Sequence, residues 1–322
     1  MKSLAITALT TLLLTAGPFG AAADEFPSRA VRIIIPYAAG GSSDTGTRLV
    51  QESFSRELGQ PVVIENRGGG GGLNATDAYF KSDHDAHTLL LGGIAPLTII
   101  PNLRSVSYVP ERDFVPIGTV WRSAQTLVVR PGLGVKTVAE FLAHAKANPG
   151  KVTIASAGLA TVAHLAAELL EREAGIDLIN VHFRSTGDTL PQILSGQIDG
   201  LFGDASLVAP HVKAGTVVAI AVAAPHRSPA LPETPTFGEA GYPTVEAEGW
   251  HGLGVLAKTP AAHVKRLRDA LSKAQASPDY QSRLKNQGGS AGEPGPEAMS
   301  KLIRTDSAKW GVIVKAANIK MN

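Results

Sequence analysis

Residues 31–44 read VRIIIPYAAGGSSD, and this stretch is the clearest indication of the fold class. The β-branched run at its start predicts a short buried strand that Pro36 ends. A glycine-rich turn follows, and a helix is expected from about Asp44 to residue 58. A strand, a loop and a helix in this order form one unit of an α/β fold.

The same order recurs along the chain. Nearly continuous apolar runs, typical of strands buried on both faces of a parallel sheet, predict strands at 61–65, 88–91, 126–129, 152–155, 178–183, 198–202 and 217–222. One helix between them has an apolar stripe suited to packing on a sheet, formed by Val162, Leu165, Ala166, Leu169 and Leu170. The chain is therefore predicted to be an α/β protein with largely parallel sheets. Its length favours two domains over one.

Three helix starts carry capping signals. Thr137 and Glu140 form the Thr-x-x-Glu pattern of a capping box. Thr259-Pro260 and Ser277-Pro278 each place a capping residue before a proline at the first helical position. Gly288 is expected to end the last of these helices.

The composition is that of an ordinary globular protein, with 44% hydrophobic and 18% charged residues. A net charge of +2 without any Lys- or Arg-rich run argues against a nucleic-acid partner. The chain has no Cys, which excludes disulfides, thiol chemistry and lipidation at an N-terminal Cys. The 34 Gly and 21 Pro predict many tight loops where backbone can approach a ligand. No internal sequence repeat is evident.

The first 23 residues are expected to be an export signal rather than part of the fold. Lys2 gives a charged start, residues 4–15 form a short apolar run, and residues 21–23 are small residues that a signal peptidase accepts. A membrane anchor is the alternative, but the apolar run is too short to span a bilayer. Cleavage is expected after Ala23.

Three loops follow the carboxyl ends of predicted strands, which is where ligands bind in open α/β sheets. These loops are residues 37–44, 68–74 and 156–161. Each of them leads toward a predicted helix, so the positive end of a helix dipole is expected beside the ligand.

The first of these loops has the composition of an anion site. It offers flexible amides at Gly40 and Gly41 and hydroxyl groups at Ser42 and Ser43, followed by a helix N-terminus. This combination suits a carboxylate. The alternative is an ordinary glycine turn in which Ser43 or Asp44 is the helix N-cap. Asp44 is expected to be a cap or a supporting acceptor rather than a direct partner of an anion.

Other kinds of site have weaker support. The glycine run at 68–72 lacks the last glycine of a dinucleotide fingerprint. Residues 83–87 read DHDAH and resemble a metal site, but adjacent loop residues rarely converge on one ion, so a solvated turn is favoured. No G-x-S-x-G motif is present. A hydrolase that uses Ser42 or Ser43 with a distant His stays open, because the members of a triad converge only in space.

Short motifs with a fixed order and spacing run through the mature chain. Among them are Pro36-Tyr37-x-x-Gly40-Gly41-x-x-Asp44-x-x-x-Arg48, Leu58-Gly59-Gln60-Pro61-Val62-Val63-x-Glu65-Asn66-Arg67, Ser195-Gly196-Gln197-Ile198-Asp199, His211-Val212-Lys213-Ala214-Gly215 and Trp250-x-Gly252-Leu253. Each motif is weak alone. Together they resemble the periplasmic receptors of tripartite tricarboxylate transporters, also called Bug receptors.

The resemblance implies a type II-like periplasmic binding protein, in which two α/β domains are joined by two crossing hinge strands around a cleft. Domain I would comprise residues 24–122 plus 225–322, and domain II residues 123–224. Loops 37–44 and 156–161 would face each other and bind a carboxylate through amides, hydroxyls and water. The implied ligand-binding residues are Tyr37, Ala39, Gly40, Gly41, Ser42, Ser43, Asp44, Ser156, Ala157, Gly158, Thr161, Arg184 and Asp204.

The resemblance also implies a function without catalysis, metal or cofactor. A monomeric receptor in the periplasm would capture a di- or tricarboxylate, an aromatic acid or an acidic amino acid. It would then deliver this ligand to the integral-membrane permease subunits of the transporter. A receptor that docks on a signalling protein is the alternative, and a periplasmic serine hydrolase is less favoured.

The chain departs from the usual family pattern near the implied site. Ala38-Ala39 stands where a Pro is usual, and residues 202–204 read Phe-Gly-Asp in place of Phe-Asp. Arg184 lies in a segment that replaces a typical Val-Pro-Tyr-Lys-Gly. It could reach a second ligand carboxylate or brace Asp188 or Asp204, and bracing is favoured because Arg pairs readily with a nearby Asp. These differences bear on the identity of the ligand.

Overall fold

The computed structural model describes residues 26–183, 186–287, 289–291, 294–317 and 319. The predicted signal peptide lies outside the described residues. Within them, no helix has both the length and the apolar character needed to cross a membrane.

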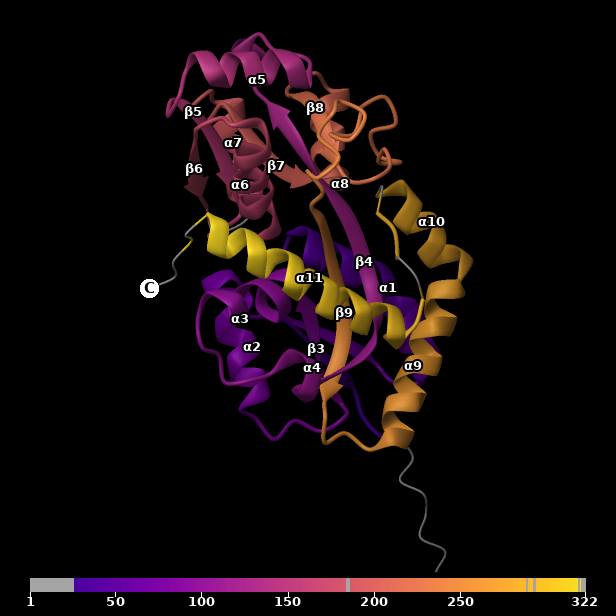
Figure 1. The fold of residues 1–322 in the computed structure, drawn as a ribbon. Coiled ribbons are helices and arrows are strands. Elements are labelled where there is room, and N and C mark those ends of the chain that lie inside the picture. Colours follow the sequence, from indigo (N-terminus) through magenta and orange to yellow (C-terminus); the bar gives the residue numbers. More distant parts are fainter. Residues whose placement is uncertain (1–25, 184–185, 288, 292–293, 318, 320–322) are drawn as a thin grey trace, which may run out of the picture.

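The described residues form a nine-stranded mixed sheet with helices packed against it (Figure 1). The strand order is β2-β1-β3-β9-β4-β7-β5-β6, with β8 paired to β4. The strands are β1 Val31–Ile35, β2 Val62–Asn66, β3 Thr88–Gly93, β4 Phe114–Val129, β5 Val152–Ser156, β6 Leu178–His182, β7 Gly200–Asp204, β8 Val218–Ala223 and β9 Glu248–Leu256. The α-helices are α1 Ser42–Leu58, α2 Leu73–Phe80, α3 Ile100–Leu103, α4 Pro110–Asp113, α5 Val138–Ala147, α6 Val162–Ala174, α7 Thr186–Leu194, α8 Ala205–Lys213, α9 Ala261–Ala276, α10 Pro278–Asn286 and α11 Pro296–Ala316.

Strand β4 joins two halves of this sheet (Figure 1). Its residues 114–124 pair with β9, and its residues 125–129 pair with β7 and β8. We call the part with β1, β2, β3 and β9 the first half, and the part with β5, β6, β7 and β8 the second half. The described elements of the second half lie between residues 125 and 223, inside the range predicted for domain II.

Each parallel pair among the described strands includes β1 or β5, the strands that lead to loops 37–44 and 156–161. Strand β1 pairs in parallel with β2 and β3, and β5 does the same with β6 and β7. Among the described pairs, each antiparallel one involves β4 or β9. The two halves therefore repeat one α/β arrangement, and antiparallel strands connect them.

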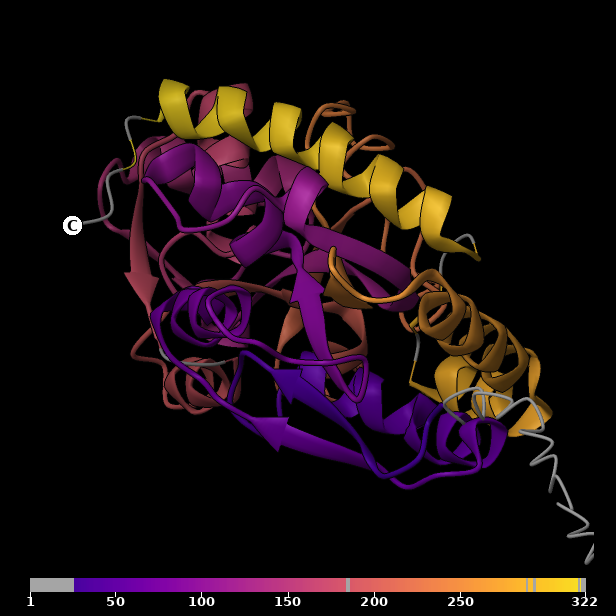
Figure 2. The same ribbon diagram turned by 90° about the horizontal axis from the view of Figure 1, so that it is seen from below.

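Each half has its own apolar core. In the first half, Phe54 of α1 and Leu267 of α9 are fully buried in one cluster with Val31 and Ile33 of β1. In the second half, the stripe predicted for α6 is buried except for the half-exposed Val162. Helix α11 lies across both halves and contacts the turn at Ala95–Ile99 and helix α6 (Figures 1 and 2). Burial of one such apolar side chain contributes about 1.5–3 kcal/mol.

Two of the three helix-start predictions are confirmed. Thr137 and Glu140 form a complete capping box, and Ser277 caps α10 by accepting the N–H of Tyr280 at 3.3 Å. The third prediction is wrong, because Pro260 rather than Thr259 is the N-cap of α9. The Thr259 N–H donates back to Leu256 in a preceding turn, so the helix begins later. Gly288 lies outside the described residues.

Strands β4 and β9 are the main differences from the sequence prediction. Of β4, only residues 126–129 were predicted to be a strand. Pro116 interrupts the apolar strand pattern in the sequence, and the pairing of β4 with β9 shifts register at two places. Strand β9 was not predicted, because Gly249, Gly252 and Gly254 lower its strand propensity. Packing explains two of these glycines. A Cβ at Gly252 would collide with Met299, and one at Gly254 would collide with the ring of Phe114.

Candidate ligand-binding site

A cavity of about 110 Å³ lies between the two halves, beside the loops that follow β1 and β5. One water needs about 10–15 Å³ of such volume, so the cavity has room for a small organic molecule. Of the residues predicted to bind ligand, those that line the cavity are Tyr37, Gly41, Ser42, Ser43, Ala157, Thr161 and Asp204. The first ligand loop (residues 37–44) and the second ligand loop (residues 156–161) thus contribute to the same cavity.

The first ligand loop presents an uncapped helix N-terminus to the cavity. Helix α1 begins at Ser42, and its N-cap Gly41 makes no side-chain capping hydrogen bond. The first amides of a helix have no acceptor within the helix, and they carry part of the positive end of its dipole. Because Ser42 and Ser43 line the cavity, this end of α1 is suited to an anionic group.

Asp44 stabilises this loop through hydrogen bonds but does not line the cavity. It is buried, accepts the N–H of Gly40 at 3.0 Å, and pairs with Arg48 at 3.0 Å. Burial opposes ionisation of this carboxyl, but hydrogen bonds from Arg48 and Gly40 outweigh it and lower the pKa of Asp44. Asp44 is therefore a charged acceptor that orders the loop.

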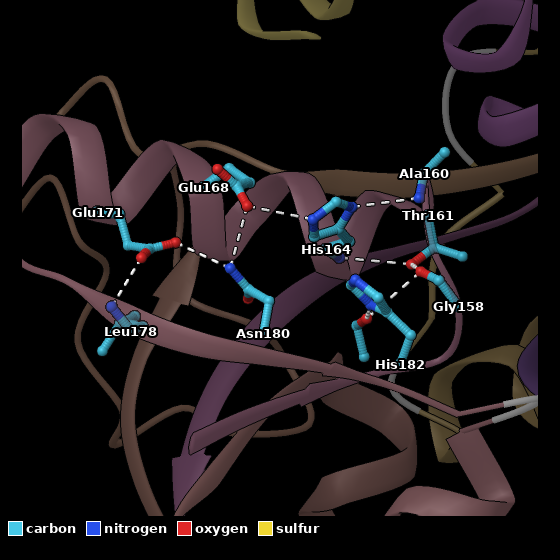
Figure 3. Close-up of polar contacts among 10 residues, drawn as sticks. Gly158, Ala160, Thr161, His164, Glu168, Glu171, Leu178, Asn180 and His182 are labelled. Carbon is cyan, nitrogen blue, oxygen red and sulfur yellow. Dashed lines mark hydrogen bonds and ion pairs between the residues drawn. The ribbon is translucent and has the colours of Figure 1, made fainter. Parts of the chain in front are cut away.

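The second ligand loop brings another helix N-terminus to the cavity. Helix α6 begins at Val162, and its N-cap Thr161 accepts the N–H of His164 at 3.4 Å (Figure 3). The Thr161 hydroxyl donates to the carbonyl of Gly158 at 2.8 Å. Val162 and Ala163 also line the cavity, so their unpartnered first-turn amides add to those of α1.

One carboxyl group lies inside the cavity. Asp204 is the last residue of β7, is 9% exposed, and accepts a hydrogen bond from Gln125 Nε2 of β4 at 2.9 Å. Burial raises the pKa of Asp204, while hydrogen bonds from Ser42 and Gln125 act in the opposite direction. No Lys or Arg is among the described residues that line the cavity. Ile94 and Trp250 give it an apolar wall.

A family model described as "Tripartite tricarboxylate transporter family receptor" matches residues 47–319. The chain belongs to this receptor family. The family assignment agrees with the fold, in which two helix N-termini converge on one cavity.

Individual relatives cover nearly the whole receptor. It is 32% identical over 300 residues to a UPF0065 protein in the tcbD-tcbE intergenic region of Pseudomonas sp. strain P51, covering 93% of this chain and 89% of the relative. It is 30% identical over 301 residues to Protein BugT of Bordetella pertussis, covering 93% and 92%.

Two solved structures show the same fold with acids bound. MatC from Rhodopseudomonas palustris with bound malate is 30% identical, with a TM-score of 0.83 over 90% of this chain and 100% of that one. R. palustris Rpa4515 with adipate is 27% identical, with a TM-score of 0.86 over 92% and 99%. The receptor is thus an α/β periplasmic binding protein of the Bug type.

The cavity of this receptor also contains a Ser–His pair. Ser43 Oγ lies 3.0 Å from His251 Nε2, and burial lowers the pKa of His251 to about 4. Among the described residues, His251 Nδ1 has no hydrogen-bond partner. Because an unpartnered N–H is costly in a buried site, we infer that the proton is on Nε2 and is donated to Ser43. Such an imidazole cannot take the serine proton and has no carboxylate to orient it, which argues against the hydrolase hypothesis.

Several predicted residues lie beside the cavity rather than in its lining. They are Ala39, Gly40, Asp44, Ser156 and Gly158. Ser156 Oγ lies 2.8 Å from His182 Nδ1. Arg184 lies outside the described residues.

Sequence reasoning missed part of the lining, in particular Ile94, Gln125, Trp250 and His251. Gln125 is a polar residue directly before the predicted buried strand 126–129, which is a usable signal for a functional side chain. Trp250 and His251 come from β9, which was not predicted because its glycines lower the strand propensity of the segment. Residues 83–87 lie in a turn, where Asp85 pairs with Arg29 and with His87.

Proposed function

We propose that this receptor captures a small organic carboxylate in the periplasm and delivers it to the permease of a tripartite tricarboxylate transporter. One observation carries the proposal, namely that the N-termini of α1 and α6 line the same cavity. Two helix ends supply several amide donors and about one positive charge in total, which suits a carboxylate without a buried ion pair. Malate and adipate bound in two structures of the same fold support this class of ligand.

The position of Asp204 narrows the class of ligand. A second ligand carboxylate beside this buried acid is disfavoured, because it would either face the ionised form of Asp204 at low dielectric or need Asp204 to hold a proton. A hydroxyl or ammonium group would instead donate a hydrogen bond to Asp204. We therefore propose an acid with a hydroxyl or amino substituent, oriented with its carboxylate at the helix ends and this substituent at Asp204.

Capture is proposed to involve domain closure. The two domains would be residues 24–122 plus 225–322 and residues 123–224, with β4 and the return segment before β9 as the hinge. The halves already approach each other closely, since a Cβ at Gly71 would lie 3.6 Å from the carbonyl oxygen of Leu159. Ligand would be enclosed when the second ligand loop moves against the first.

A thermal-shift screen tests the receptor function. Mature protein is first unfolded and refolded to remove ligand acquired during expression. It is then heated with malate, adipate, citrate, benzoate, aspartate and glutamate. A ligand at 100 times its Kd stabilises the folded state by about 2.7 kcal/mol, so a true ligand raises the Tm in proportion to the logarithm of its concentration. Flat curves for all organic acids would contradict the proposal.

The role of Asp204 is tested with acids that differ by one substituent. Malate and aspartate are expected to bind at least about tenfold more tightly than succinate, because succinate has no hydroxyl or ammonium group to donate to Asp204. Asp204→Asn should reduce the preference for malate and aspartate over succinate. Gly203→Ala is unsuitable as a control, because the added Cβ would collide with Leu201. His226→Gln, at an exposed residue, is the matched control. Equal affinities for malate and succinate in calorimetry would refute the substituent proposal alone.

A further inference from the structure

Both ligand loops contain a residue in the left-handed conformation directly before the helix N-cap. In the first loop this residue is Gly40, with φ +83°. In the second it is Ala160, with φ +61°, the one non-glycine residue with positive φ within the described ranges. Ala160 is fully buried. For a residue with a Cβ this conformation costs about 1–2 kcal/mol, so neighbouring contacts must stabilise it.

The contacts of these two residues follow one pattern. The Gly40 N–H donates to the side chain four residues later, Asp44 Oδ2, at 3.0 Å. The Ala160 N–H likewise donates to the side chain four residues later, His164 Nδ1, at 3.2 Å (Figure 3). In both helices the accepting residue occupies the third helical position.

The pattern continues one helical turn further. Arg48 Nε donates to Asp44 Oδ1 at 3.0 Å, and Glu168 Oε1 lies 3.2 Å from His164 Nε2. An asparagine on the neighbouring parallel strand completes each set. Asn66 of β2 lies 3.5 Å from Arg48 Nη2, and Asn180 of β6 donates to Glu168 Oε1 at 3.0 Å. The set Asp44–Arg48–Asn66 in the first half thus corresponds to His164–Glu168–Asn180 in the second, although the sequence shows no repeat.

These contacts define the tautomer of His164. Because Nδ1 accepts the Ala160 N–H, it carries no proton, and the ring proton is on Nε2, where it is donated to Glu168. The ring is 3% exposed and lies edge-on to the His182 ring at a centroid distance of 4.4 Å. His164 does not line the cavity, so any influence on ligand passes through the second ligand loop.

We propose that His164 is a positioning residue of the ligand site, with Glu168 as the group that orients it. By accepting the Ala160 N–H, His164 keeps Ala160 left-handed and directs the first amides of α6 into the cavity. It is the counterpart of Asp44 in the first half. Only the expected effect on ligand affinity rests on the proposed function, because the hydrogen bond from Ala160 to His164 is present in the ligand-free protein.

Two amide substitutions separate the two nitrogen atoms of His164. In His164→Asn the side-chain oxygen is bonded to Cγ, as Nδ1 is, so it can still accept the Ala160 N–H. In His164→Gln the amide reaches toward Glu168 and leaves Ala160 without an acceptor. Hydrogen exchange of the ligand-free protein is expected to be at least about tenfold faster at the Ala160 amide in His164→Gln, and little changed in His164→Asn.

Ligand affinity gives the second measurement. With the acid that produces the largest thermal shift, His164→Gln should raise Kd at least about tenfold, and His164→Asn no more than about threefold. Adding Ala160→Gly to His164→Gln should restore affinity, because glycine adopts the left-handed conformation without support. A loss caused by general destabilisation would not be repaired in this way.

The outcomes distinguish this proposal from the proposed function. Equal exchange rates at Ala160 in the Gln and Asn variants, or no rescue by Ala160→Gly, would overturn the role of His164. If none of the acids in the screen binds the wild type, the receptor proposal fails while the exchange result still decides whether His164 supports the loop. His226→Gln should match the wild type in both measurements.

Discussion

The two helix N-termini at the cavity differ in how much of their donor capacity is already used. The N-cap of α1 is Gly41, which has no side chain to accept an amide. The N-cap of α6 is Thr161, whose hydroxyl accepts one first-turn amide and donates to Gly158. The first ligand loop therefore leaves more donors for the ligand, whereas the second is more completely ordered by its own contacts.

The two sides also differ in where their serine–histidine pairs lie. Ser43 lines the cavity and contacts His251, whereas Ser156 contacts His182 outside the lining. The first half thus contributes amides and a hydroxyl to the cavity lining, and the second half contributes amides and Asp204. We therefore expect ligand affinity to be most sensitive to substitutions in the first ligand loop, and the stability of the ligand-free protein to substitutions in the second.

The largest expected effect comes from Gly41→Val. Gly41 has φ −82°, and an added Cβ would meet only the Ala38 carbonyl oxygen, at 3.8 Å, so the fold tolerates the change. The larger side chain would block the end of α1 and weaken binding by at least about 100-fold, equivalent to about 2.7 kcal/mol. Calorimetry should show this loss and a smaller one for Gly41→Ala. Undiminished affinity in folded Gly41→Val would show that the ligand does not use this helix end.

The second effect concerns the pH dependence of stability. His251 has a pKa of about 4 in the folded protein and an ordinary value of 6.5. Between these values the unfolded chain binds a proton that the folded chain does not, so the free energy of unfolding falls as pH decreases from about 6.5 to about 4. The slope from this one group is at most about 1.4 kcal/mol per pH unit.

His251→Gln removes the titrating group and retains an amide that can reach Ser43. Urea unfolding at several pH values should show a smaller loss of stability in acid for this variant than for the wild type. Parallel curves for the two proteins would mean that His251 does not titrate as its burial indicates.

The smallest effect is expected from Thr161→Val. This change keeps the shape of the N-cap but removes the oxygen that accepts the His164 N–H. Loss of a cap costs about 1 kcal/mol of stability. Because the Thr161 hydroxyl is already used within the loop, ligand affinity should change less than about threefold. A large loss of affinity without loss of stability would place the Thr161 hydroxyl against the ligand and reverse the comparison.

Regular apolar patterns made much of this fold predictable. The strands at the centre of each half and the stripe on α6 follow directly from residue periodicity. The loops that reach the cavity were found because parallel strands place their carboxyl ends, and the following helix N-termini, at one edge of a sheet. Local sequence therefore sufficed wherever one strand leads to one loop.

The rest of the site depends on contacts between distant segments. Gln125 and Asp204 meet through the antiparallel pairing of β4 with β7, and Ser43 meets His251 across 208 residues of sequence. Neither contact can be recognised from the sequence immediately around these residues. Strand β9 was not predicted for a related reason, since Met299 packs against Gly252 and Phe114 packs against Gly254, and neither position has room for a side chain.

Trp250 gives the protein a built-in optical reporter. Trp250 lines the cavity, and its indole N–H donates to Asp306 Oδ2 of α11 at 2.6 Å, which fixes the ring. The other two tryptophans, Trp121 and Trp310, are buried away from the cavity lining and supply a constant background. Because Trp250 belongs to the cavity lining, ligand capture should change the intrinsic fluorescence without any added dye.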